Sequence, residues 1–147
     1  MTIGPGNVCP VCAGRPQVVV AVAHRAMRAL IVDLLAADHG CWAVSAVAGI
    51  TALVGAITTH PDLVVVDAAD FAACCCGLLG SFPLDRVVVI GPEPDPAYRR
   101  ATLDRGAGAW LSRDLVADEL SAALRLALDC CSHGPVPTAP DRDVSNG

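Results

Sequence analysis

Three short runs of valine and isoleucine constrain the fold of this 147-residue chain more than any other feature. They are QVVVAVA at 17–23, LVVVD at 63–67 and RVVVI at 86–90. Continuous β-branched runs of this length are typical of parallel strands that are buried on both faces of a sheet. Because such strands need helices on each side, the sequence predicts an α/β domain.

The segments around these runs supply the helices and two shorter strands. Apolar residues at helical spacing predict helices at 26–38, 50–58, 71–79 and 96–105, and a last one capped by Asp114 and running to about Cys131. Short strands are predicted at 42–47 and 107–111. The order, strand then helix repeated five times, favours a parallel doubly wound sheet. This pattern alone leaves flavodoxin-like and nucleotide-binding folds open, although no glycine-rich phosphate loop follows the first strand.

The chain divides into three parts by composition. Residues 1–16 are interpreted as an irregular Cys-containing leader, and residues 17–131 as a single domain. Residues 132–147 are rich in proline and polar residues, so they are predicted to be a disordered tail.

Four segments, in this order, resemble a response-regulator receiver domain: AVAHRAMRALIVDLL, HPDLVVVDAAD, RVVVIGPEPD and DRGAGAWLSRDLVADELSAALRLAL. Together they cover about residues 17–129. The resemblance implies a flavodoxin-like five-stranded parallel sheet of order 2-1-3-4-5, with its site at the carboxyl ends of the strands.

The resemblance also locates the positions at which a receiver takes up phosphate. It places Asp67 at the phosphoacceptor position. The remaining positions carry residues unlike the family's: Val22 and Ala23 for the acidic pair, Gly91 for the hydroxyl residue, Arg113 for the lysine, and Trp110 for the switch aromatic. One carboxylate is a poor cage for Mg²⁺, and metal and lysine normally offset the charge of the transferring phosphoryl group.

We therefore expect little or no phosphorylation. The sequence favours a stand-alone pseudo-receiver, a signalling module that acts by protein–protein interaction and is not an enzyme. A conventional two-component response regulator, phosphorylated at Asp67, is the alternative from the same family.

The chain has eight cysteines, which is high for its size. In a cytosolic protein this points to metal or redox chemistry more than to a disulfide framework. The predicted topology brings the leader and the end of the last helix to the same edge of the sheet. A zinc or iron–sulfur site is thus one hypothesis, with candidate ligands Cys9, Cys12, Cys130, Cys131 and His133. A disulfide and simple packing remain open, and a metal- or redox-sensing regulator is a second functional class. No other cofactor is expected.

The net charge of −5 argues against a broad nucleic-acid footprint. The residues after 131 are too few and too proline-rich for a DNA-binding domain, so no direct nucleic-acid partner is expected. No apolar run is long enough to span a bilayer and no secretory signal is visible, which predicts a cytoplasmic protein without a membrane partner. The sequence does not identify the protein partner. Residues 96–131 are the expected interface, and a homodimer is predicted there.

Overall fold

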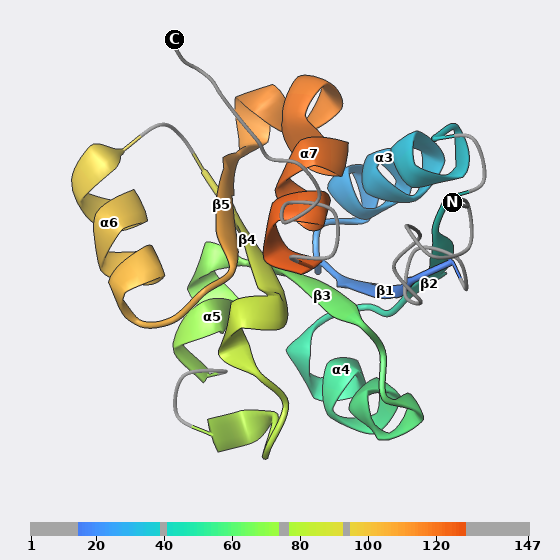
Figure 1. Cartoon of the computed structure of the whole chain (residues 1–147), viewed down its shortest axis with the longest axis horizontal. Coiled ribbons are helices and arrows are strands. Elements are labelled where there is room, and N and C mark those ends of the chain that lie inside the picture. Colours follow the sequence, from blue (N-terminus) through green and yellow to red (C-terminus); the bar gives the residue numbers. More distant parts are fainter. Residues whose placement is uncertain (1–14, 39–40, 74–76, 93–94, 129–147) are drawn as a thin grey trace, which may run out of the picture.

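The computed structural model describes residues 15–38, 41–73, 77–92 and 95–128. Five parallel strands form one sheet in the order β2-β1-β3-β4-β5 (Figure 1). The strands are β1 (Gln17–Ala21), β2 (Ala43–Ala46), β3 (Leu63–Asp67), β4 (Val87–Gly91) and β5 (Ala109–Ser112). This order confirms the predicted flavodoxin-like topology.

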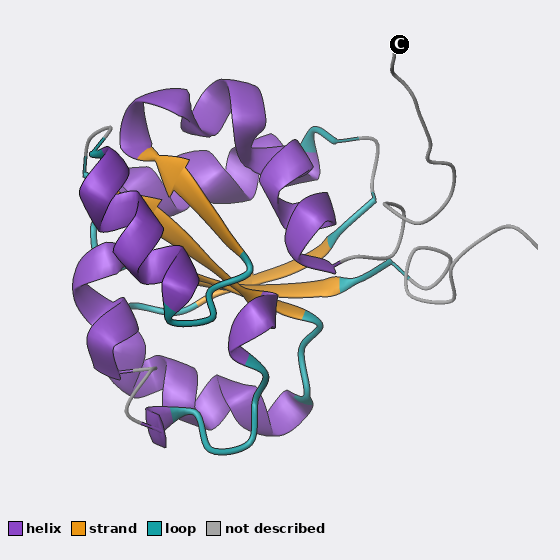
Figure 2. Ribbon diagram, turned by 60° about the vertical axis from the view of Figure 1, so that its left-hand side comes forward, coloured by secondary structure: helices purple, strands orange, loops and turns teal. Residues whose placement is uncertain are grey.

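Helices cover both faces of the sheet, as Figure 2 shows from a second direction. They are α3 (Arg25–Ala36), α4 (Ile50–Ala56), α5 (Ala68–Ala73), α6 (Pro96–Asp104) and α7 (Val116–Leu128). The first and last of these, α3 and α7, pack on each other and on one face, as the strand order predicts. Helices α4 and α5 cover the other face, where α6 lies beside β5 (Figure 1).

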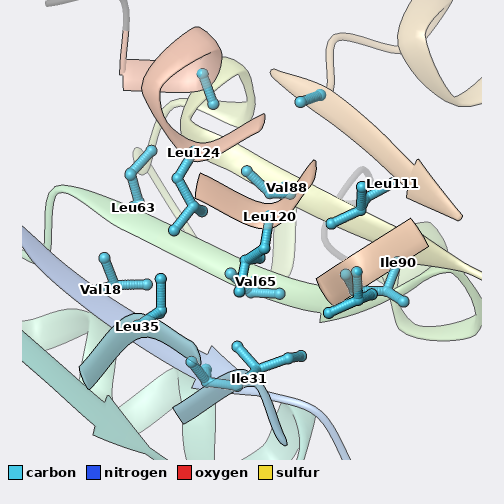
Figure 3. Close-up of a cluster of buried hydrophobic side chains, with 14 of the residues drawn as sticks. Val18, Ile31, Leu35, Leu63, Val65, Val88, Ile90, Leu111, Leu120 and Leu124 are labelled. Atoms are coloured by element: carbon cyan, nitrogen blue, oxygen red, sulfur yellow. The ribbon is translucent and has the colours of Figure 1, made fainter. Parts of the chain in front are cut away.

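The valine runs form the centre of the core because successive strand residues point to opposite faces. Val18, Val65 and Val88 face α3 and α7, and Figure 3 shows them packed against leucines of those helices. Their neighbours Val64 and Val89 face α4 and α5 instead. All five are fully buried, at 0% exposure. Each such side chain contributes roughly 1.5–3 kcal/mol through burial, so both helical layers are held by the same three strands.

A polar cluster joins α3 to α7 at the edge of the first core layer. The Asp38 Oδ2 atom accepts hydrogen bonds from Trp42 Nε1 at 2.7 Å, Ser121 Oγ at 2.7 Å and Arg125 at 3.2 Å. The Arg125 guanidinium also lies over the Trp42 ring, 5.2 Å from its centroid. Through Ser121 and Arg125, the carboxylate of Asp38 thus connects the end of the first helical segment to α7, more than eighty residues further along the chain.

Most predicted boundaries are correct to within one or two residues. The first helix ends at Ala36 and not at Asp38, whose carboxylate serves the polar cluster just described. The last helix is not capped by Asp114. That residue lies in a 3-10 turn, Arg113–Leu115, and α7 begins at Val116.

The third predicted helix is placed wrongly at its start. It was predicted from Phe71, but α5 begins at Ala68, directly after the last strand residue, Asp67. Asp70 falls in its first turn, where a carboxylate interacts favourably with the helix dipole. The end of this helix was predicted at Leu79, and residues 74–76, which include Cys74 to Cys76, lie outside the described residues.

Candidate site at the carboxyl edge of the sheet

The positions singled out in the sequence lie at or near the carboxyl ends of four neighbouring strands, β1, β3, β4 and β5. Parallel pairing aligns Ala21 with Val66, Asp67 with Ile90, and Gly91 with Ser112. Paired strands lie about 4.8 Å apart, so residues that end neighbouring strands are brought side by side. The topology therefore assembles one candidate site from segments spread over ninety residues of sequence.

Asp67 is the carboxylate at the centre of this edge. Its side chain is 16% exposed, and its Oδ1 atom lies 3.8 Å from the Arg113 guanidinium, which is 43% exposed. That separation is an ion pair but too long for a hydrogen bond. Oδ1 has no hydrogen-bond partner within the described part of the chain. Arg113 therefore screens the charge of Asp67 without fixing its orientation.

The two residues at the acidic-pair position offer no side-chain ligand. Val22 is fully buried in the core and Ala23 is exposed. Their backbone carbonyls accept hydrogen bonds from Arg28 of α3, at 2.8 Å for Val22 and 3.2 Å for Ala23. A guanidinium thus occupies the end of β1, next to the strand that carries Asp67.

His24 follows this pair and begins α3. It is exposed, and its Nδ1 atom accepts a hydrogen bond of 3.2 Å from the backbone N–H of Met27. Its role visible here is therefore that of a helix N-cap. The sequence contained this signal, since a side-chain acceptor just before an apolar helical pattern is typical of an N-cap.

Asp70 is a second carboxylate at the site that the motif comparison did not single out. Burial raises the pKa of Asp70 above its ordinary value, and the negative charge of Asp67 raises it further. The sequence pattern contained no clear signal for this carboxylate, because the helix was predicted to begin only at Phe71, whereas α5 begins at Ala68 and contains Asp70. Asp67 therefore has both a cation and a like charge within electrostatic reach.

Gly91 and Trp110 form one packing unit. A Cβ atom on Gly91 would lie 1.8 Å from Cζ2 of Trp110, so the indole rests directly on the glycine backbone. The ring of Tyr98 also packs against the indole, tilted by 56°, with its centroid 5.2 Å from that of Trp110. A hydroxyl-bearing side chain at position 91 and this orientation of the indole exclude each other.

The metal hypothesis falls mostly outside the described residues. Cys9, Cys12, Cys130, Cys131 and His133 all lie there. Cys41 is described as half-buried, packed against the core layer between α3, α7 and the sheet. Among the residues that the structure describes, no three histidine, cysteine or carboxylate side chains gather where one ion could be held.

Comparison with solved structures defines the class of fold. No family model matches the chain, and no curated protein matches it in sequence. The receiver domain of the response regulator NarL from Mycobacterium tuberculosis is 24% identical, with a TM-score of 0.51, covering 81% of this chain and 98% of that one. The receiver domain of the Francisella response regulator 1452 is 14% identical, with a TM-score of 0.63 and coverages of 78% and 98%. A response regulator from Desulfuromonas acetoxidans is 18% identical, with a TM-score of 0.61 and coverages of 77% and 96%.

The chain thus has the doubly wound, flavodoxin-like class of fold. Within that class its fold is receiver-like, because many of the solved structures that resemble it are response-regulator receivers. Identities this low establish the fold alone. None of the helices in the described ranges has the length and apolar character needed to cross a membrane.

Proposed function

We propose that this chain is a pseudo-receiver, a signalling module of receiver fold that binds protein partners without being switched by phosphorylation. The observation that carries the proposal is the position of Arg28. Its guanidinium binds the carbonyls of the two residues that stand in place of the metal-binding acidic pair. A second guanidinium, that of Arg113, lies at Asp67.

These charges disfavour a divalent cation at the edge. Mg²⁺ needs near-octahedral oxygen ligands, several of which are normally carboxylates or waters. Here Val22 and Ala23 supply no side-chain oxygen, and their carbonyls already accept hydrogen bonds. A divalent cation would also meet the positive charge of Arg28. Without a metal, the charge that develops on a transferring phosphoryl group loses its main stabilisation.

Incubation with acetyl phosphate and Mg²⁺, followed by intact-mass measurement, tests the proposal. We expect the mass to stay unchanged. The double variant Val22→Asp, Ala23→Asp is the matched comparison, since it restores the acidic pair on the same scaffold, and its folding is checked by circular dichroism. A phosphoryl adduct on Asp67 of the unchanged protein would overturn the proposal in favour of a conventional response regulator.

The surface formed by α6, β5 and α7 is the proposed interface, and we propose a homodimer through it. Two shallow depressions lie along this surface, and they share Arg99, Trp110 and Glu119. Leu126 of α7 borders one of them and is 63% exposed, the highest value among the large apolar residues that the structure describes. Burying an apolar side chain this exposed at an interface removes apolar surface from water, which favours association.

Sedimentation of the Leu126→Glu variant tests this interface. We expect the variant to sediment as a monomer at concentrations where the unchanged protein is a dimer. Leu30→Glu is the control, because Leu30 is 40% exposed on α3, a helix outside the surface formed by α6, β5 and α7. A monomeric unchanged protein, or an equal effect of both substitutions, would contradict the homodimer.

A further inference from the structure

One of the two depressions has the residue types of a site for a positively charged side chain. It lies between the start of α6, the end of β5 and the start of α7, with a volume of about 250 Å³. Its wall contains an indole, a serine, two carboxylates and a guanidinium: Trp110, Ser112, Asp95, Glu119 and Arg99. With Pro96 and Leu115, these residues complete the lining.

The indole wall is held in place from behind. Trp110 rests on the backbone of Gly91 and is packed by Tyr98 from the side. It is therefore a preorganised aromatic surface, which needs little ordering when a ligand binds. The face of an indole attracts cations, and guanidinium groups most often.

The charges of the depression favour a cation over an anion. Asp95 and Glu119 carry two negative charges and Arg99 carries one positive charge, which leaves one negative charge uncompensated. Asp95 caps α6, where its Oδ1 atom accepts from the backbone N–H groups of Ala97 and Tyr98. Neither Arg99 nor Glu119 forms an ion pair with the described residues, so the Glu119 carboxylate is available to a ligand.

Ser112 adds a hydrogen-bonding group. The residue is 5% exposed, and its hydroxyl has no hydrogen-bond partner in the ranges that the structure covers. A buried hydroxyl without a partner destabilises the folded protein. A ligand that brought a donor to this wall would therefore gain more than one that met a satisfied surface.

The chain already contains a guanidinium site built from the same residue types. At the polar cluster described above, Arg125 lies over Trp42, and the carboxylate of Asp38 accepts from Arg125 and from the Ser121 hydroxyl. An indole and a carboxylate thus hold an arginine within this protein, and the serine hydroxyl donates to that carboxylate. The depression repeats this set with Trp110, Glu119 and Ser112.

We propose that this depression receives an arginine side chain from an exposed segment of a partner protein. The inference rests on the proposed function as an interaction module and names the chemistry of its partner. The guanidinium would stack on Trp110 and pair with Glu119. Its positive charge would offset the one uncompensated negative charge of the depression. The ligand is thus a basic peptide segment, selected by arginine.

Titration with a blocked Gly-Arg-Gly peptide, observed through the indole N–H signals in ¹H–¹⁵N NMR spectra, tests the proposal. We expect saturable, millimolar binding that shifts the Trp110 signal and leaves Trp42 unshifted. A Gly-citrulline-Gly peptide, which has the same shape without the charge, should not bind. Glu119→Gln should weaken binding about threefold to fivefold, as expected for one exposed ion pair. In the Trp110→Leu variant, where the backbone N–H signal of Glu119 reports binding, the affinity should fall by a similar factor through loss of the cation–π contact.

Asp118→Asn is the matched control, since Asp118 is the neighbouring exposed carboxylate on α7 and does not line the depression. Equal weakening by Asp118→Asn and Glu119→Gln would mean nonspecific attraction and would overturn the proposal. So would equal binding of the citrulline peptide, or a Trp110 signal that never saturates. The acetyl phosphate experiment does not involve this depression, so its result is independent of the titration. Because the depression shares Arg99, Trp110 and Glu119 with the surface proposed for the homodimer, the titration uses the Leu126→Glu variant, which we expect to be a monomer.

Discussion

Adding one methyl group at Gly91 should destabilise the protein, and the structure gives the reason and the approximate size. The new Cβ would lie 1.8, 2.3 and 2.6 Å from three atoms of the Trp110 ring. Carbon atoms in contact sit about 3.5–4.0 Å apart, so the indole would have to move by roughly 1.5–2 Å or leave its position. Overpacking of this kind costs about 1–3 kcal/mol, and we expect Gly91→Ala to cost about 2 kcal/mol.

The cost should depend on the indole. In a Trp110→Ala background the clash disappears, and Gly91→Ala should then cost less than about 0.5 kcal/mol, which leaves a coupling energy of about 1.5 kcal/mol or more. Gly55→Ala is the matched control, because Gly55 lies in α4 and a Cβ there would meet nothing within 4 Å. That substitution should stabilise the protein by up to about 1 kcal/mol through helix propensity.

Urea unfolding followed by far-ultraviolet circular dichroism measures all five proteins, the four of the cycle and Gly55→Ala, without relying on tryptophan emission. The slope of free energy against urea must stay constant for the midpoints to be compared. If Gly91→Ala costs the same with and without Trp110, or behaves like Gly55→Ala, the packing unit described here does not exist in solution.

Three further substitutions test other parts of the structure. Asp38→Ala removes the acceptor of three hydrogen bonds and should cost roughly 2–3 kcal/mol in urea unfolding, a figure discounted for partial exposure of the cluster. Gly108→Ala should reach the upper end of roughly 1–3 kcal/mol, because its Cβ would lie 2.1 Å from the backbone oxygen of Asp85, which cannot rotate away. Asp70→Asn should increase the free energy of unfolding at neutral pH but not at strongly acidic pH. The folded state raises the pKa of Asp70, so the ionised carboxylate destabilises the fold, and this destabilisation appears as the pH rises through the raised pKa. If the shift is absent, the difference in unfolding free energy between Asp70→Asn and the unchanged protein would not depend on pH.

The fold could be predicted from the sequence because its strongest signals are local. The runs at 17–23, 63–67 and 86–90 define three buried strands, and the alternation with helices leaves few topologies. The start of α5 was harder to predict, since no turn residue separates it from β3. When a helix begins at the residue directly after a strand, the sequence contains no glycine or proline that marks the boundary.

The positions of the candidate site could also be predicted, but not how their side chains interact. Gly91 and Trp110 were each placed correctly at the edge and on β5. Their direct contact depends on the rotamer of the indole across two paired strands, which no spacing rule contains. The same holds for Arg28, whose guanidinium turns back six residues to the carbonyl of Val22 instead of pointing into solvent.

The charges at the carboxyl edge give the proposed independence from phosphorylation a physical basis. Arg28 and Arg113 bring two positive charges to the edge, and Asp67 and Asp70 bring two negative ones. A receiver that uses Mg²⁺ needs an excess of carboxylates, which the cation then neutralises. Here Arg113 pairs with Asp67 in the place of an added cation. A divalent cation would add positive charge beside two guanidinium groups, and a phosphoryl group would add negative charge beside Asp70, whose ionised form is already disfavoured. Each addition would place a charge beside protein groups of the same sign. This repulsion is the electrostatic argument for the proposed independence from phosphorylation.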